Sequence, residues 1–350
     1  MNHKVLQIFY QIKKLTYIVS IILFSNCSIS QNTKEVSTKY ASTITAKELS
    51  DHLYIYASDE FEGRDTGEPG QKKAVDYLKN FYISQGIESP INENDYFQKV
   101  PASYMNTLIR SGALKDSENV VAYIKGSEKP EEIIIVSAHL DHVGVNEEGE
   151  IFNGADDDGS GTVAILEIAE AFKKAQMESN GPKRSILFLH VTGEEKGLLG
   201  SRYYTENPIF PIANTIANLN IDMIGRIDEY HKENPKYIYL IGSDKLSTEL
   251  HTISEEMNKK HMNIELDYKY NDDNDPNRFY YRSDHYNFAK NNIPVIFYFN
   301  GTHEDYHRPT DVPEKINYEQ LENRARLIFH TAWELANRKD RIIADKVEKN

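Results

Sequence analysis

Short apolar runs alternate with amphipathic stretches through the middle of the chain. Runs of four to eight apolar, β-branched and aromatic residues predict buried strands. They are Ile133 to Ala138, Ile186 to Thr192, Ala217 to Ile221, Tyr237 to Ile241 and Pro294 to Phe299. Helical spacing of apolar residues predicts helices from Ala46, near Lys72 to Gln85, over Gly161 to Ala175, around Lys245 to Lys259 and over Tyr318 to Asn337. This alternation predicts a single α/β domain with a mostly parallel, mixed sheet between helices, and an active site at the carboxyl ends of its strands.

The two ends of the chain depart from this pattern. Lys13 and Lys14 precede an apolar run, Leu15 to Phe24, that is too short to span a bilayer and is typical of an export signal. The next residues are rich in Ser, Thr and Lys, which suits a tether. We expect a signal peptide over 1–27, a flexible linker over 28–45, one large folded domain over 46–340 and a polar tail over 341–350.

Cys27 is the only cysteine and directly follows the apolar run. An internal disulfide is therefore excluded, and lipidation of this thiol is the more specific interpretation of its position. The segment resembles a bacterial lipoprotein signal, which implies an exported protein of the periplasm or cell envelope with a lipid anchor. Plain secretion is the alternative.

The formal charge of the chain is -14, and its acidic residues are scattered along the sequence. Binding to phosphate backbones requires clustered Lys and Arg, so no nucleic-acid partner is expected. The acidity indicates a soluble surface.

The first unusual polar residues follow the strand predicted over Ile133 to Ala138. There the chain reads His139-Leu140-Asp141-His142. A histidine at a strand end can bind a metal while a nearby aspartate orients its ring, although a hydrogen-bonded structural histidine is the simpler interpretation.

Three consecutive carboxylates, Asp156, Asp157 and Asp158, stand immediately before a predicted helix. Neighbouring carboxylates repel one another. The helix N-terminus could stabilise one of them, but not all three. A divalent cation would explain the cluster.

Further acids and histidines follow the remaining strands. Glu194 and Glu195 are adjacent, so one side chain could bind a metal while the other acts as a general base. Asp222 ends an apolar strand, where a buried charge is costly unless it is paired or coordinated. In the loop after the last strand, either His303 or His307 could be a ligand.

The order of these motifs resembles a known family. The chain contains His-x-Asp, Gly-Ala-Asp-Asp-Asp-x-Ser-Gly, Gly-Glu-Glu-x-Gly-Leu-x-Gly-Ser, Asp-Met and a late His-x-x-x-Asp. This combination is similar to the co-catalytic di-zinc aminopeptidases of the bacterial leucyl type, which are relatives of glutamate carboxypeptidase and glutaminyl cyclase. The resemblance covers about Ala46 to Asn337 and implies a metallo-aminopeptidase that acts on peptides.

The resemblance also implies a ligand set for two zinc ions. His139 and Asp222 would bind one ion, Glu195 and His307 would bind the other, and Asp157 would bridge them. Three carboxylates, two dications and a bridging hydroxide sum to zero charge, so the set is self-neutralising.

Other roles follow from the same resemblance. It implies a cis peptide between Asp157 and Asp158, Glu194 as general base, and Asp141 as the residue that orients His139. Glu194 would take a proton from a metal-bridged water and return it to the leaving amine. Tyr280, with Tyr281 as its rival, would stabilise the tetrahedral oxygen.

Several alternatives stay open at this point. A glutaminyl cyclase would use one zinc, and a receptor-like binding module would have lost ligands, whereas all five are present here. The sequence does not fix the preferred N-terminal residue or the oligomeric state. A carboxypeptidase or dipeptidase would need a cation for the C-terminal carboxylate, and the candidates are Arg226, Arg278, Arg282 and Arg308.

Overall fold

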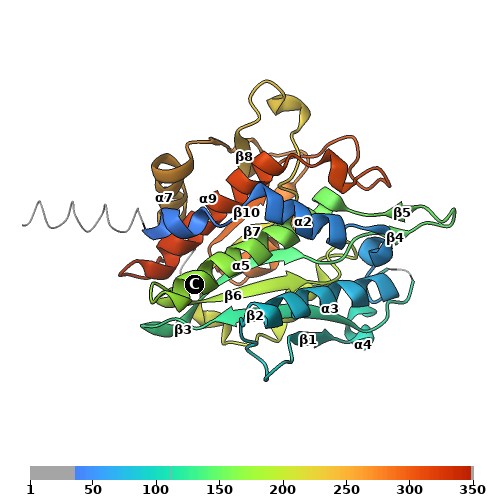
Figure 1. Cartoon of the computed structure of the whole chain (residues 1–350), viewed down its shortest axis with the longest axis horizontal. Helices are drawn as coiled ribbons and strands as arrows, with labels where there is room; N and C mark the ends of the chain where they lie inside the picture. Colours follow the sequence, from blue (N-terminus) through green and yellow to red (C-terminus); the bar gives the residue numbers. More distant parts are fainter. Residues whose placement is uncertain (1–35, 111, 348–350) are drawn as a thin grey trace, which may run out of the picture.

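The computed structural model describes residues 36–110 and 112–347, so the predicted signal peptide and Cys27 lie outside the described residues. Within these residues an eight-stranded sheet runs in the order β1-β2-β6-β3-β7-β10-β8-β9 (Figure 1). Its strands are β1 Phe97–Val100, β2 Ser117–Ile124, β3 Lys129–His139, β6 Arg184–Val191, β7 Thr215–Ile221, β8 Tyr237–Ile241, β9 Glu265–Asp267 and β10 Val295–Phe299. A small hairpin of β4 (Gly144–Val145) and β5 (Ile151–Phe152) stands apart from it.

The centre of the sheet is parallel. β3 pairs in parallel with β6 and β7, and β10 pairs in parallel with β7. β2 and β8 flank this group as antiparallel neighbours. The carboxyl ends of β3, β6, β7 and β10 therefore meet at one edge of the sheet, which confirms the predicted fold class.

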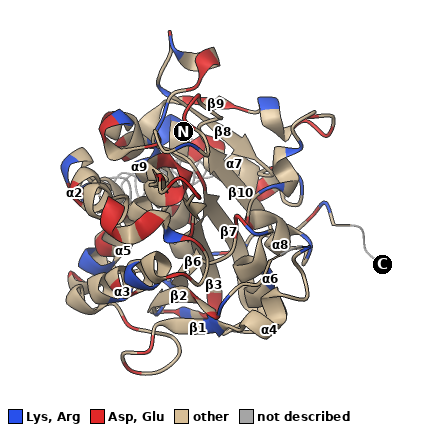
Figure 2. Cartoon of the chain, turned by 90° about the vertical axis from the view of Figure 1, so that its right-hand side faces the viewer, with Lys and Arg blue, Asp and Glu red and all other residues tan. Residues whose placement is uncertain are grey.

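Helices cover both faces of the sheet (Figure 2). One layer contains α2, α3, α5, α7 and α9, and the other contains α6 and α8. The short helix α4 packs near β1. Their bounds are α2 Ala46–Tyr56, α3 Pro69–Ser84, α4 Ala102–Met105, α5 Gly161–Met177, α6 Leu199–Glu206, α7 Thr248–Met257, α8 His285–Ala289 and α9 Tyr318–Asn337.

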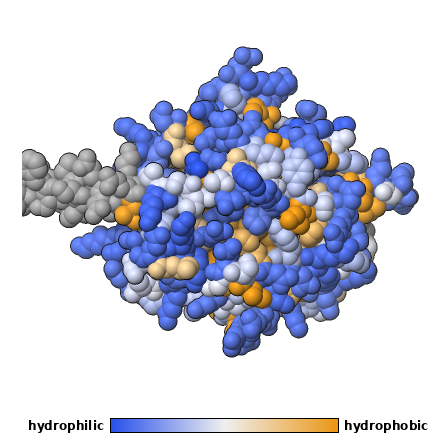
Figure 3. All heavy atoms as spheres, viewed as in Figure 1, coloured by the Kyte–Doolittle hydropathy of each residue, from blue (hydrophilic) through white to orange (hydrophobic). Residues whose placement is uncertain are grey.

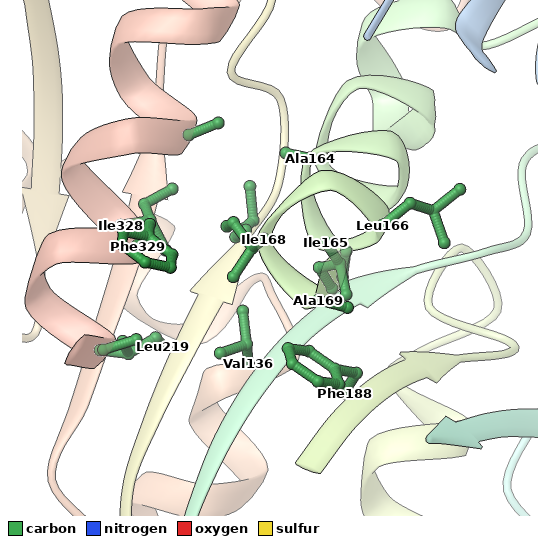
Figure 4. Close-up of a cluster of buried hydrophobic side chains, with 14 of the residues drawn as sticks. Val136, Ala164, Ile165, Leu166, Ile168, Ala169, Phe188, Leu219, Ile328 and Phe329 are labelled. Carbon is green, nitrogen blue, oxygen red and sulfur yellow. The ribbon is translucent and has the colours of Figure 1, made fainter. Parts of the chain in front are cut away.

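Alternating residues of β3 enter two different cores. Val136 lies with Ile168 of α5 and Phe329 of α9 on one face, as Figure 4 shows. Ile133 and Ile135 point into the second core. Each fully buried side chain of this size contributes about 1.5–3 kcal/mol. Because helices cover both faces of the sheet, the sequence of this strand contains an unbroken apolar run.

The folded body extends beyond the predicted bounds at both ends. Residues 36–41 are helical, and Tyr40 is buried with its ring stacked 5.7 Å from that of Trp333. Ile44 is also fully buried. The predicted flexible linker is therefore wrong for residues 36–45, because their apolar side chains complete the core beside α9. The predicted polar tail likewise begins too early, since Ile342 is buried in the same core.

The surface carries both signs of charge. Lys, Arg, Asp and Glu are interspersed over helices and loops (Figure 2), and the face in Figure 3 is mostly hydrophilic with isolated apolar spots. Within residues 36–110 and 112–347, every helix is too short or too polar to cross a bilayer.

Candidate metal centre

Two donors at neighbouring strand ends form the first half of the centre. His139 ends β3 and Asp222 directly follows β7. The register pairs Ser137 with Asn220, so His139 and Asp222 stand at the same level two residues later. The His139 Nε2 atom lies 3.7 Å from an Asp222 carboxylate oxygen and 3.1 Å from Asp157 Oδ1. We call His139 and Asp222 the strand half.

Two donors on loops form the other half. Glu195 follows β6, and His307 lies in the loop after β10 with a backbone φ of 54°. The His307 Nε2 atom is 3.0 Å from Asp157 Oδ2 and 3.2 Å from Glu195 Oε1. We call Glu195 and His307 the loop half. Each oxygen of Asp157 faces one half, as expected of a bridging carboxylate.

These donors fit divalent cations. His139 Nε2 and Glu195 Oε1 are buried and find no hydrogen-bond partner among the described residues. Leaving such groups unpaired in the interior is costly, and a cation would satisfy both. Mixed imidazole and carboxylate donors suit zinc. Burial alone would raise the pKa of Asp157, yet His139 and His307 hold it well below its usual range.

The three consecutive acids have three different partners. Asp158 accepts hydrogen bonds from the backbone N–H groups of Gly161, Met223 and His139, so it satisfies the N–H group of the first residue of α5. Asp156 accepts one from Gly225 N–H at 2.6 Å. Only Asp157 faces the metal donors. The predicted cis peptide between Asp157 and Asp158 is present.

The structure decides between the two loop histidines. His303 Nε2 lies 3.1 Å from the Asp156 carboxylate and faces neither half of the centre. Asp311 accepts from the backbone N–H groups of both Asp156 and Asp157, at 3.0 and 3.2 Å. His303 and Asp311 therefore support the turn that presents Asp157, and His307 is the loop histidine that faces Asp157 and Glu195.

Glu194 lines the cleft in front of the metal donors together with Asp157 and Asp222. Burial and the neighbouring carboxylates, Glu195 first among them, raise the pKa of Glu194 well above its usual value. Its backbone N–H donates to Asp141 Oδ1 at 3.2 Å, and the Thr66 hydroxyl donates to Asp141 Oδ2 at 2.9 Å. The Asp141 carboxylate thus fixes the Glu194 backbone.

Asp141 contacts His139 differently from the prediction. His139 Nδ1 lies 3.0 Å from the backbone carbonyl oxygen of Asp141 and 3.9 Å from its carboxylate. The imidazole is therefore oriented by the main chain at this residue, because the carboxylate is turned toward Thr66 and Glu194.

Tyr280, the tyrosine predicted to stabilise the tetrahedral oxygen, is not among the residues that line the metal cleft. Tyr280 lines a neighbouring pocket with Lys245 and Tyr281, and that pocket contains none of the metal donors. Tyr306 lines the metal cleft instead, and its ring stacks on His307 at 4.0 Å. The distance of Tyr280 from Ser283 in the sequence could not show which way the Tyr280 ring faces. The position of Tyr306 directly before His307 could have marked Tyr306 as a residue of the cleft.

The remaining cleft walls are mostly apolar. They are formed by Met223, Phe279, Phe297 and Phe299, with Thr302 and Arg282.

The four candidate arginines differ in their surroundings. Arg226 is buried and paired with Asp305 at 2.9 Å. Arg278 lines the pocket of Tyr280 and lies over the Tyr281 ring. Of the four, only Arg282 lines the metal cleft, where it rests on the Phe279 ring.

Two supporting residues were missed by reasoning from the sequence. Ser283 Oγ donates to Asp222 Oδ2 at 2.6 Å and accepts from Asn220. The buried Arg64 guanidinium donates to the carbonyl oxygens of Leu140, Gly154, Asn153 and Tyr56. Ser283 is next to Asp284 in the sequence, which was a weak indication that it belongs to the site. No neighbouring residue in the sequence indicates a supporting role for Arg64.

Comparisons with known proteins agree with this geometry. The family model described as Peptidase family M28 matches residues 119–332. A probable leucine aminopeptidase of Arthroderma benhamiae is 31% identical over 275 residues, which are 76% of this chain and 71% of that protein. Leupeptin-inactivating enzyme 1 of Streptomyces exfoliatus is 30% identical over 174 residues, 49% of this chain and 34% of the enzyme.

The match spans about a third or less of the length of the first curated relatives, such as the Streptomyces enzyme. Among solved structures, a zinc aminopeptidase from Bacillus subtilis superposes with a TM-score of 0.64 at 16% identity, covering 87% of this chain and 99% of that one. At this identity the likeness shows a common fold.

Proposed function

This chain belongs to peptidase family M28, and from that premise we propose that it is a zinc-dependent exopeptidase that removes N-terminal residues from peptides. One observation carries the proposal. Asp157 presents one oxygen to each of two donor groups, and Glu194 lines the cleft beside them. The relatives named leucine aminopeptidase and zinc aminopeptidase support the same activity.

We assign two zinc ions to the centre. His139 and Asp222 would hold one, Glu195 and His307 the other, and Asp157 would be shared. When bound, such a pair lowers the pKa of a water molecule and polarises the scissile carbonyl.

Glu194 is the general base in this proposal. Its side chain lines the cleft beside the proposed ligands, so it could accept a proton from the attacking water and pass it to the leaving amine. The hydrogen bond from its own N–H to Asp141 holds the backbone during this transfer. Tyr306 is positioned to donate its hydroxyl hydrogen to the tetrahedral oxygen, because it lines the same cleft.

A substrate panel tests the proposal. We expect purified protein to hydrolyse aminoacyl amides and free peptides, to lose this activity with a chelator, and to regain it with zinc. The apolar walls favour substrates with an apolar N-terminal side chain. Cleavage of N-blocked peptides at the same rate, or full activity in the presence of chelator, would overturn it.

A carboxypeptidase or dipeptidase is the second candidate, favoured by Arg282 alone. Its guanidinium lines the metal cleft, where it could bind a C-terminal carboxylate. Paired substrates that differ only in a free or amidated C-terminus distinguish the two. A strict requirement for the free carboxylate would favour this candidate over the aminopeptidase.

We also propose that the protein is exported and tethered through a lipid on Cys27. The apolar run directly before this cysteine supports the proposal. Fractionation of cells tests it: the wild type is expected in the membrane fraction and Cys27→Ala in the soluble fraction. A soluble wild type would contradict the tether.

A further inference from the structure

His142 is a buried histidine beside the loop half that none of the roles above uses. It lies three residues after His139, and its side chain is completely buried. His142 Nδ1 is 2.9 Å from Glu195 Oε1 and 3.8 Å from Asp157 Oδ2. Its ring meets that of His307 edge to face, with ring centres 5.6 Å apart.

The contact of His142 with Glu195 is close without being a hydrogen bond. Among residues 36–110 and 112–347, neither His142 ring nitrogen nor Glu195 Oε1 has a hydrogen-bond partner. His231 offers a contrast, since its Nδ1 makes a regular hydrogen bond of 2.8 Å with Asp228. The His142 Nδ1 to Glu195 Oε1 distance of 2.9 Å is almost the same as that of the His231 hydrogen bond. The two atoms therefore fail the angular requirement of a hydrogen bond and not the distance requirement. Donors that converge on a common ion have this arrangement.

In the strand half, His139 also lies close to a carboxylate without forming a hydrogen bond to it. Its Nε2 lies 3.1 Å from Asp157 Oδ1 and is likewise buried without a hydrogen-bond partner in the described part of the chain. His142 thus resembles a proposed ligand of this centre more than it resembles a structural histidine such as His231.

The His142 ring is held firmly in place. A Cβ atom added at Gly154 would come within 2.6 Å of its ring carbons, so the ring packs directly on the Gly154 backbone. The His142 backbone N–H donates to the carbonyl oxygen of Arg64 at 3.2 Å. These contacts leave Nδ1 facing the carboxylates of Glu195 and Asp157.

We propose that His142 Nδ1 is a further ligand of the zinc ion held by Glu195 and His307. This inference rests on the proposed function, because it assumes that the centre binds zinc. A neutral imidazole adds no charge, so the charge balance of the centre is unchanged. The two halves become unequal, with three protein donors at the strand half and four at the loop half when Asp157 is counted in both.

X-ray absorption at the zinc edge tests this on the wild-type protein loaded with two zinc ions. Three histidine ligands shared by two ions give an average of about 1.5 imidazoles per ion, whereas His139 and His307 alone give about 1. Because this measurement needs no variant, it does not depend on whether a substituted protein folds. An average of about 1 would overturn the inference.

A substitution at His142 provides a second, independent test. His142→Phe keeps a ring against Gly154 and removes the donor, and we expect competition with a chromophoric chelator to show one ion weakened. The loss should exceed about 100-fold, the upper end for a partner outside the coordination sphere. The matched control is His190→Gln, which removes a buried imidazole that bonds Tyr82 in the core. It should leave both affinities unchanged.

The outcomes separate this inference from the proposed function. Unchanged zinc affinities in His142→Phe, with a wild-type average of about 1 imidazole per ion, would overturn the inference and leave the peptidase proposal standing. A wild-type chain that binds no zinc would overturn both. A loss of only about tenfold would assign His142 to positioning Glu195, and so would also contradict ligation.

Discussion

The two halves of the metal centre are built in different ways. His139 and Asp222 emerge from adjacent parallel strands, and their side chains are 1% and 11% exposed. Glu195 and His307 lie on loops, and the His307 side chain is 37% exposed. Backbone pairing fixes the strand half, whereas the loop half depends on hydrogen bonds between distant segments. Asp157 faces both, so it joins a pair of donors carried by strands to a pair carried by loops.

The largest expected effect comes from removing what the halves share. Asp157→Asn should release the ion of the strand half, where only His139 and Asp222 remain, weaken the ion of the loop half, and lower activity by at least about 10⁴-fold. Metal content by emission spectroscopy and turnover of an aminoacyl substrate check this. Retention of both ions with wild-type affinity would show that Asp157 is not shared by the two halves.

The adjacent residues Glu194 and Glu195 should separate catalysis from metal binding. Glu194→Gln is expected to lower kcat by about 10³-fold with both ions retained, since an amide cannot accept the proton. Glu195→Gln should instead lose an ion. Turnover near that of the wild type in metal-loaded Glu194→Gln would remove Glu194 from the role of base.

A smaller change should act on the strand half alone. Ser283→Ala removes the hydroxyl that donates to Asp222, and we expect zinc affinity at one site to fall by about 10–100-fold. The buried Ser254 of α7 provides the control, because Ser254→Ala removes a hydroxyl far from the centre. Equal weakening of both ions would contradict a distinct strand half.

The smallest effect concerns pH in metal-free protein. Burial alone would lower the pKa of His307, but Asp157 and Glu195 raise it to about 10. Because this value exceeds the unfolded pKa of about 6.5, the stabilisation is complete below pH 6.5 and is lost as pH rises through about 10.

Solvent screens the partly exposed His307 ring, so the fall in Tm over this range should be only about 2–4 °C. His139 shifts in the same direction, so His307→Ala should lessen the dependence without abolishing it. Zinc should remove the dependence, because a bound imidazole is neutral. Calorimetry across this pH range, with and without zinc, checks both statements.

Most of the fold could be predicted from the sequence because its central elements are locally marked. The bounds of β8 and α9 match the prediction, and the other central strands overlap it closely. β9 has only three residues and is defined by its pairing with β8. α6 carries Gly200 within its first turn, so helical periodicity did not reveal it.

The site was harder to predict than the fold. The residues alone marked acids and histidines after buried strands as candidate donors, among them Asp222 and Glu195, although a structural role was the simpler interpretation of His139. Reasoning from the residues left His303 and His307 open, and only the resemblance chose between them. The position of Tyr280 and the contacts of Asp141 could not be predicted, because they depend on how loops distant in sequence fold against one another.

Arg64 makes the proposed metal centre depend on a part of the chain that contributes no ligand. Every proposed ligand lies within residues 119–332, the part that matches the family model. Yet the loops that carry His139 and Asp157 are tied to α2 by a single buried guanidinium from outside that part. A fragment beginning at residue 119 would contain all the ligands and fail to assemble them. Transplanting this chemistry into another protein therefore requires the N-terminal segment as well as the motifs.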